Sequence, residues 1–275
     1  LLPRPVAQTQ LDEQGIAERY DIVIDFSRYQ VGQKVWMVNL AEQDDGKLVK
    51  KNRSLSDALQ GKSEDPCVGK FLEFRIAREP VYPDRSRVPA TLIPNPDLSN
   101  VPVARTRVFE FGRGAKNVTG DPQTAFSGPW GTTFNGGVME AADFGRASAR
   151  PKLGTRETWV LKNGGGGWDH PIHIHFEEGQ ILARDGSAAN VPAWEKGRKD
   201  VYRLRPGGSV TITLQFRDWG GMFMEHCHNT VHEDNAMLLR WELDNRGTSV
   251  LKPLPTPIAT PNGVTFRDAT SVPKA

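Results

Sequence analysis

All six histidines of this chain lie in two short segments, HPIHIH at residues 170–175 and HCHNTVH at residues 226–232. Histidines scattered at random along 275 residues would not gather in this way, and core packing gives no reason for their absence elsewhere. Both segments have a strand-forming context, and two neighbouring strands can combine their side chains into one site. The fold must therefore bring these two segments side by side.

The hydrophobic pattern is that of short β-strands. We predict strands at residues 20–26, 34–40, 70–76, 106–111, 158–163, 209–216 and 237–243. Aromatic and β-branched residues dominate these runs, and Gly, Pro and Asp separate them, which is typical of a β-sandwich. Helical periodicity is scarce, and residues 57–62 predict at most one turn of helix. The expected fold class is all-β.

Proline marks the expected domain boundary. Six prolines lie between Glu79 and Val103, which favours an extended crossover, and we predict an interdomain linker at residues 79–104. Residues 1–78 hold too few strands for a complete sandwich, so we expect the end of a domain whose beginning is absent. Residues 105–245 are long enough for a whole sandwich domain. The Pro- and Thr-rich residues 246–275 are expected to form a surface tail.

Composition excludes several classes of partner. The formal charge is +2, with 25% charged and 37% hydrophobic residues, so no strong field points to nucleic acid. No apolar run approaches the length of about 18 residues that a membrane span needs. The opening LLPRPVAQTQ shows no targeting peptide. Cys67 and Cys227 lie in unlike contexts that do not suggest a disulfide, and Cys67 is interpreted as a spare thiol.

Side-chain alternation along a strand divides the candidate ligands between two faces. In HIH, His173 and His175 point to one face of the strand. In HCH, His226 and His228 share one face, whereas Cys227 points to the other. The sequence therefore predicts two metal sites back to back, one using the thiolate and the other using the flanking imidazoles.

The cysteine side has a distinctive set of candidate ligands. His232 and Met237 follow Cys227 by five and ten residues, and His170 comes from the other segment. Two imidazoles, a thiolate and a weak thioether are the ligands of blue-copper electron-transfer sites. Zinc is the competing interpretation, but it favours more thiolates or a Cys₂His₂ set, and methionine is a poor zinc ligand. The donor set favours copper.

Together, HPIHIH and HCHNTVHEDNAM resemble the paired C-terminal copper motifs of three-domain multicopper oxidases, which include laccases and bilirubin oxidase. The opening LLPRPV…ERYDIVIDF is similar to the end of the second domain in the spore-coat laccase group. The resemblance covers most of residues 1–245 and implies cupredoxin-like Greek-key β-sandwich domains. It assigns residues 1–78 to the C-terminal portion of a second cupredoxin domain and residues 105–245 to a C-terminal cupredoxin domain with the copper ligands.

The resemblance also implies a role for each ligand. The type 1 copper would be bound by His170, Cys227, His232 and Met237. His173 would serve the type 2 copper, while His175, His226 and His228 would serve the type 3 pair. Cys227 would then be catalytic as well as a ligand, because one covalent stretch connects the type 1 site to the oxygen-reducing cluster.

Residues next to the candidate ligands are candidates for supporting roles. Glu233 matches an acidic position that is thought to deliver protons in some relatives, and it is the other candidate catalytic residue. The alternative role for Glu233 is a hydrogen bond that orients an imidazole. Asp234 is expected to be structural. Trp168 and Asp169 are expected to form a loop, although they could line the substrate edge near His170.

The chain departs from the family in one respect. The trinuclear cluster of the family uses eight histidines, and the four that come from the N-terminal domain have no counterpart here. The resemblance therefore implies an N-terminal polypeptide of the same oxidase as a partner, with O₂ and a small reducing substrate.

The expected activity is oxidation of a substrate at type 1 copper, coupled to the reduction of O₂ to water. A phenol or an aromatic amine is the favoured substrate, and a periplasmic or secreted location is expected. The alternatives are a type 1 copper electron carrier, a two-domain copper nitrite reductase, or an oxidase of Cu(I) or Mn(II). Met222 and Met224 are interpreted as core residues rather than as a route for cuprous ions.

Overall fold

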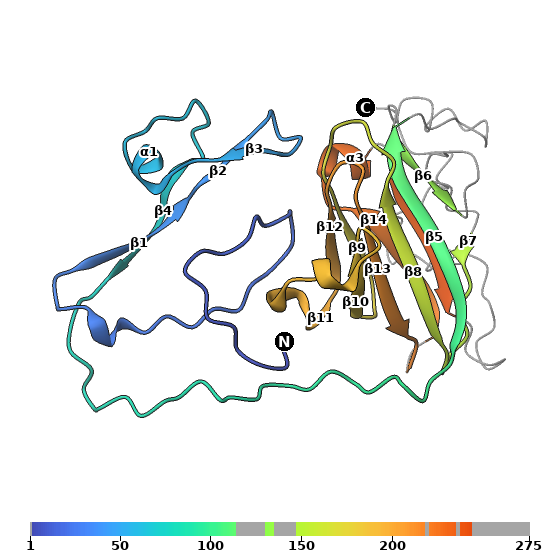
Figure 1. Cartoon of the computed structure of the whole chain (residues 1–275), viewed down its shortest axis with the longest axis horizontal. Coiled ribbons are helices and arrows are strands. Elements are labelled where there is room, and N and C mark those ends of the chain that lie inside the picture. The colour runs from blue at the N-terminus through green and yellow to red at the C-terminus, as the bar shows by residue number, and fades with distance from the viewer. Residues whose placement is uncertain (1, 114–129, 135–146, 218–219, 235–236, 244–275) are drawn as a thin grey trace, which may run out of the picture.

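The computed structural model describes residues 2–113, 130–134, 147–217, 220–234 and 237–243 (Figure 1). In these ranges β-strands predominate, and the prediction of an all-β fold is confirmed. The expected surface tail, residues 246–275, lies outside the described residues. Among the described residues, no helix has the length and apolar character needed to cross a membrane.

Two sheets face each other in the second half of the described chain (Figure 1). Over the described ranges, the larger sheet has the order β11-β10-β13-β8-β5-β6. Its strands are β5 Val103–Arg113, β6 Trp130–Phe134, β8 Arg156–Asn163, β10 Gly179–Arg184, β11 Arg198–Lys199 and β13 Ser209–Gln215. The other sheet, within the same limits, has the order β12-β9-β14-β15-β7. Its strands are β7 Ala147–Ala149, β9 His170–Ile174, β12 Val201–Leu204, β14 Gly221–Cys227 and β15 Leu238–Leu243.

Aromatic rings fill the space between the two sheets. Trp159 of β8 and Trp241 of β15 meet edge to face, with 5.7 Å between ring centroids, and Phe216 lies 5.5 Å from Trp241. All three side chains are fully buried. Such rings contribute both a large buried apolar area and a geometric preference, so they fix the distance and orientation of the sheet that carries the histidines.

A buried ion pair also lies in this core. Arg107 of β5 donates two hydrogen bonds to Glu157 of β8, at 2.6 and 2.8 Å, and the indole N–H of Trp159 donates to the same carboxylate at 2.9 Å. The charges of Arg107 and Glu157 are therefore matched inside the sandwich, as burial of charge requires.

The N-terminal part has only small sheets in the described residues. β1 Lys34–Asn39 pairs with β4 Gly69–Arg75, and β2 Ala41–Gln43 pairs with β3 Val49–Asn52. The short helix α1, Leu55–Leu59, begins where the Ser54 hydroxyl accepts the Asp57 N–H. Apolar side chains remain exposed here, including Val23 and Phe71 at 77% and 62%.

The strand predicted at residues 20–26 is absent from the structure. Residues 20–25 form no regular element, and the 3₁₀ turn η1 follows at Phe26–Arg28. The sequence pattern is suitable for a strand, but β1 and β4 pair only with each other in the described chain. A strand needs a neighbour for its backbone groups, and an apolar pattern alone does not supply one.

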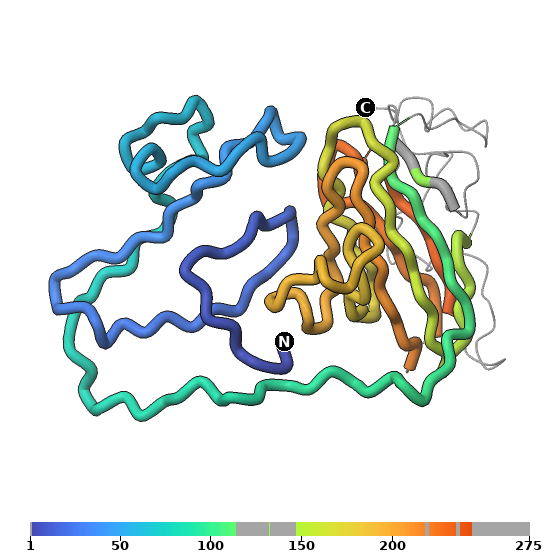
Figure 2. The backbone as a smooth tube through the Cα atoms, in the orientation of Figure 1, coloured from blue at the N-terminus to red at the C-terminus, as the bar shows by residue number. Residues whose placement is uncertain are grey.

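Residues 77–102 contain no helix or strand and run as a long extended connection to β5 (Figures 1 and 2). Two further 3₁₀ turns, η2 Ala188–Asn190 and η3 Ala193–Glu195, follow β10. The remaining described helix is α3, Thr230–Asp234, which lies between β14 and β15.

Glu225 of β14 contrasts with the matched pair of Arg107 and Glu157. Its side chain is fully buried, it lies opposite Ile174 and Leu239 in the sheet, and neither carboxyl oxygen has a hydrogen-bond partner among the described residues. Burial raises the pKa of Glu225 well above its usual value. An unpartnered carboxyl group in the core lowers the stability of the fold.

We therefore predict that Glu225→Leu raises the free energy of unfolding of the metal-free chain by about 1–3 kcal/mol, because it removes an unpartnered polar group. Urea denaturation at pH 7 measures the change through its midpoint. Glu225→Gln is the matched control, because it keeps a polar group of the same shape and should give less than half of this gain. Equal stabilisation by both variants, or destabilisation by leucine, would contradict the interpretation.

Candidate metal centre

The pairing of β9 with β14 brings the two histidine segments together. The strands are antiparallel, with His226 opposite His173 and Cys227 opposite Ile172. Residues directly opposite each other in such a pair share a face of the sheet. Cys227 therefore lies with Ile172 on the core face, whereas His226 lies with His173 on the other face, and the predicted division between two faces is present.

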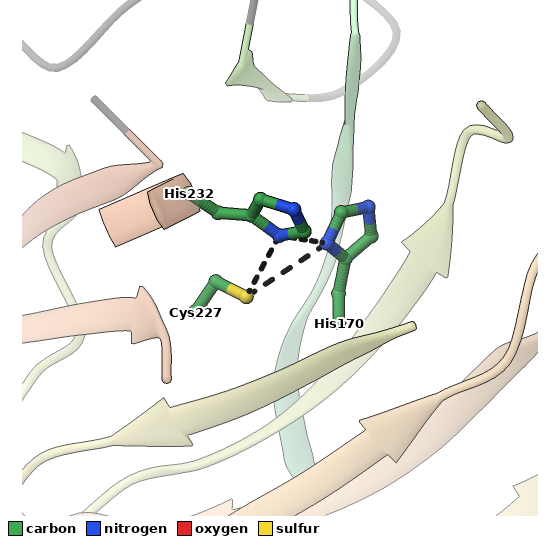
Figure 3. Close-up of side chains that lie close together, drawn as sticks. All are labelled: His170, Cys227 and His232. Atoms are coloured by element: carbon green, nitrogen blue, oxygen red, sulfur yellow. Dashed lines mark hydrogen bonds between the residues drawn. The ribbon is translucent and has the colours of Figure 1, made fainter. Parts of the chain in front are cut away.

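On the core face, Cys227 meets His170 and His232 (Figure 3). The Cys227 Sγ lies 3.7 Å from His170 Nδ1 and 3.5 Å from His232 Nδ1, and the two Nδ1 atoms are 3.0 Å apart. Metal bonds of about 2.0–2.3 Å hold neighbouring donor atoms at separations of about 3–4 Å. All three residues are fully buried. Their donor set of two imidazoles and one sulfur fits copper.

Helix α3 fixes the position of His232. The Asn229 carbonyl accepts the N–H groups of His232 and Glu233, each at 2.9 Å. The Asn229 side chain also accepts the Val231 N–H at 3.1 Å, which starts the helix. The helix thus turns the chain sharply after β14 and points the His232 imidazole back toward Cys227.

Met237 is held beside these ligands through its backbone. Its N–H donates to the His232 carbonyl at 3.0 Å, and its carbonyl accepts the Cys227 N–H at 3.2 Å. The Met237 side chain is fully buried. The sequence prediction of a thioether ligand at this position is therefore compatible with the fold and stays a prediction.

On the opposite face, His173, His226 and His228 place ring nitrogens within 4.8 Å of one another. His175 joins them through a separation of 3.1 Å between its Nε2 and the Nε2 of His226. The ring centroids of His226 and His228 are 4.7 Å apart. The four imidazoles that the sequence placed outside the cysteine site therefore form one cluster.

Two acidic residues orient imidazoles in this cluster. His173 Nδ1 lies 2.9 Å from the backbone oxygen of Asp200, and His226 Nδ1 lies 3.1 Å from Glu233 Oε1. Partners of this kind fix the rotation of a ring and leave its Nε2 for a metal. Of the two roles considered for Glu233, the contact favours orientation of the ligand. The sequence did not indicate the contact of Asp200 with a candidate ligand, since Asp200 lies 27 residues from His173.

The titration behaviour of the buried groups suits metal binding. Burial lowers the pKa of His170 to about 3 and those of His232, His175 and His226 to about 4. These imidazoles are therefore neutral at pH 7 and their nitrogens can bind metal. Burial has the opposite effect on Cys227, because it raises the pKa of the thiol to about 12. A metal that binds there must displace the thiol proton.

We predict that binding of Co²⁺, a spectroscopic probe, to the cysteine site of the metal-free chain releases about one proton per ion between pH 6 and pH 8. The proton comes from Cys227, since His170 and His232 are neutral imidazoles in this range and need not lose a proton to bind metal. The apparent affinity then rises about tenfold per pH unit. Visible absorption gives the affinity, and calorimetry in buffers of different ionisation enthalpy gives the proton count.

Cys227→Ser serves as the control for this titration and should remove the cobalt–thiolate absorption. Release of two or more protons, or an affinity for Co²⁺ that does not change with pH, would contradict a protonated Cys227 thiol beside neutral His170 and His232.

Other residues considered in the sequence have clear positions. The Trp168 ring lies edge to face with His232, with 5.0 Å between centroids, and Lys47 Nζ lies 5.8 Å from the centre of the Trp168 ring. Asp169 forms an ion pair with Arg203. Cys67 is exposed and belongs to neither cluster.

Comparison with known proteins shows which family the chain belongs to. The multicopper oxidase family profile matches residues 117–246. The bilirubin oxidase of Albifimbria verrucaria is 34% identical over 244 residues, which cover 86% of this chain and 37% of that protein. The laccase of Haloferax volcanii is 31% identical over 233 residues, covering 83% of this chain and 34% of that protein. The chain belongs to the multicopper oxidase family.

Solved structures support the same fold. A laccase from Pediococcus acidilactici superposes with a TM-score of 0.51 at 26% identity, covering 81% of this chain and 38% of that one. The 2F4 variant of the McoA multicopper oxidase from Aquifex aeolicus gives a TM-score of 0.56 at 18% identity, which shows the fold alone, over 80% of this chain and 43% of that one. The sandwich of this multicopper oxidase chain is cupredoxin-like, as predicted.

The relatives are considerably longer than the chain. It spans 37% of the length of the bilirubin oxidase and 34% of the length of the laccase from Haloferax volcanii.

Proposed function

We propose that this chain contributes the electron-accepting site and half of the oxygen-reducing site of a laccase-like multicopper oxidase. The observation that carries the proposal is the position of Cys227 between His226 and His228. Cys227 lies with the buried pair of His170 and His232, while its two neighbours belong to the cluster on the opposite face. One short stretch of backbone thus connects both sites.

In this proposal, His170, Cys227, His232 and Met237 hold the type 1 copper. His173 serves the type 2 copper, and His175, His226 and His228 serve the type 3 pair. Copper, when bound, supplies one-electron redox chemistry at the cysteine site and O₂ binding at the histidine cluster. Four one-electron oxidations of the substrate, with four protons, balance the reduction of one O₂ to two waters.

The protein groups provide positioning and a dry environment for this chemistry. The Cys227 side chain and its bonds to the two flanking residues form the covalent path between the sites. The full burial of His170, Cys227 and His232 excludes water from the electron-accepting site. The partly exposed Glu233 carboxylate lies 3.1 Å from His226 Nδ1, where it could orient this ring or pass protons to the cluster.

The remaining four imidazoles of the cluster are proposed to come from a second region of polypeptide outside this sequence. The N-terminal part supports this view, because its exposed apolar side chains and its two-stranded sheet of β1 and β4 leave surface for further chain to cover. We propose that residues 1–78 complete a second cupredoxin domain with that polypeptide, and that residues 79–104 connect it to the sandwich. A phenol or aromatic amine as substrate, and a location outside the cytoplasm, follow from the family resemblance.

Native mass spectrometry of the purified protein tests this assembly. The expected result is a complex of this 30.5 kDa chain with a further polypeptide that carries about four copper ions, as the eight-histidine cluster of the family implies. A chain that binds one copper and never associates with another polypeptide would favour the electron carrier and overturn the proposal.

Two variants separate the roles of the two sites in the copper-loaded complex. Cys227→Ser should abolish both the visible copper–thiolate absorption and O₂ consumption, because it removes the ligand and the path. His228→Ala should keep the absorption and lose O₂ consumption by at least about 100-fold, because it changes only the outer cluster. Cys67→Ser is the matched control and should change neither. Normal O₂ consumption in the His228 variant would contradict the assignment.

A further inference from the structure

A short N-terminal segment lies along the edge of the histidine-bearing sheet. We call residues 13–19 the ionic strap, because Glu13, Glu18 and Arg19 each form an ion pair with residues 199–203. Figure 2 shows the dark-blue N-terminal segment close to the sandwich. These residues begin and enter β12, the edge strand that pairs with β9. The strap therefore contacts the strand next to the one that carries His170 and His173.

The first chain of contacts leads to the cysteine site. Glu13 Oε2 lies 2.6 Å from Arg203 Nη1. Arg203 Nε donates to Asp169 Oδ2 at 2.7 Å, and Arg203 Nη2 lies 2.6 Å from the same oxygen. Asp169 immediately precedes His170. The Arg203 side chain is only 8% exposed, so its positive charge must be compensated inside the protein, and the carboxylates of Glu13 and Asp169 do this. Removing the charge of Glu13 leaves Asp169 as the remaining carboxylate partner of Arg203. The ion pair between Arg203 and Asp169 then changes, and Asp169 is the residue next to His170.

The second chain of contacts leads to the histidine cluster. Arg19 forms a bidentate pair with the Asp200 carboxylate, at 2.8 and 3.0 Å. The backbone oxygen of Asp200 accepts from the Ile174 N–H at 3.0 Å and lies 2.9 Å from His173 Nδ1. Arg19 itself is largely exposed, but bidentate geometry makes such a pair more effective than an ordinary surface pair.

Between these two contacts, Glu18 anchors the strap. Its carboxylate accepts from Lys199 Nζ at 2.6 Å through one oxygen and from the Gly15 N–H at 2.7 Å through the other. Glu18 is buried, and Lys199 also reaches Glu195 at 2.9 Å. The middle of the strap is therefore fixed to the start of β12, while its two ends act on different histidines.

We propose that the ionic strap positions the metal ligands of both sites, Glu13 acting on His170 through Arg203 and Asp169, and Arg19 acting on His173 through Asp200. The inference rests on the proposed function for the identity of the metals, but its contacts belong to this chain alone. Glu13 and Arg19 are positioning residues and touch no reacting group. Each of the two residues is expected to affect a different site. A general loss of stability would instead affect both sites, so experiments can distinguish the two explanations.

Co²⁺ binding to the purified protein after removal of its metals tests the first half. Glu13→Gln should weaken the affinity of the cysteine site about 10-fold or more and shift its cobalt–thiolate absorption, as loss of a ligand-orienting partner does. Arg19→Gln should change this affinity by less than about twofold. Glu73→Gln, which removes an ion pair between β4 and β1, is the matched control and should also leave the site unchanged.

Nuclear magnetic resonance of the imidazole nitrogens tests the second half in the same metal-free chain. In the unmodified protein, His173 should carry its proton on Nδ1, facing the Asp200 oxygen. Arg19→Gln should shift His173 toward the other tautomer, whereas Glu13→Gln should leave its spectrum unchanged. The spectrum of His175 serves as an internal reference for the cluster.

Crossed effects support the proposal, with Glu13 acting only on the cysteine site and Arg19 only on His173. Equal losses at both sites in either variant would show that the strap acts through overall stability, and no change in either would show that it does not position the ligands. Both outcomes would overturn the proposal. These measurements need neither a partner polypeptide nor oxidase activity, so their result is independent of the test of the proposed function.

Discussion

The register between β9 and β14 is the constraint on which the rest of the site depends. With His226 opposite His173, the cysteine faces the core and the flanking imidazoles face outward. A shift of one residue would turn one set of side chains to the wrong face and separate the donors of both clusters. The pairing of these two strands therefore determines the composition of each site before any metal binds.

The two sheets of the sandwich have different structural roles: one carries the candidate ligands and the other packs against it. The described members of both clusters come from β9, β14, helix α3 and the residues next to them, all on the five-stranded sheet. The six-stranded sheet supplies the apolar and aromatic surface against which that sheet packs, including Trp159 and the matched pair of Arg107 and Glu157. A rigid support of this kind keeps the ligand rings in place. The ligands themselves can be buried without a counterion, because neutral imidazoles and a protonated thiol carry no net charge.

Much of the fold could be predicted from the sequence, because the strands of the larger sheet have clear apolar patterns. Residues 158–163 and 209–216 were predicted within two residues of the observed β8 and β13. The hydrophobic pattern did not define β9 or β14, since histidines interrupt it, and only the ligand spacing indicated that they lie together. The strand expected at residues 20–26 was wrong because its pattern could not show whether a neighbouring strand is present.

The contacts of the site were much less predictable than its ligands. Cys227 and the histidines can be recognised as candidate ligands by residue type, and alternation along a strand divides them between two faces of the sheet. Arg203 and Glu13 are 190 residues apart, and neither belongs to a recognisable motif. Ion pairs of this kind depend on how a distant segment crosses the sheet edge, which local propensity does not encode.

The contact of Glu233 with His226 shows how closely support and chemistry are combined. The Glu233 carboxylate lies 3.1 Å from His226 Nδ1, next to the Cys227 backbone oxygen at 3.3 Å, while His226 Nε2 lies 3.1 Å from His175 Nε2. Burial raises the pKa of Glu233, so proton uptake there is easier than at an exposed carboxyl group. Protonation would weaken the same contact that orients His226. A role of Glu233 in proton delivery would therefore compete with its contact to His226.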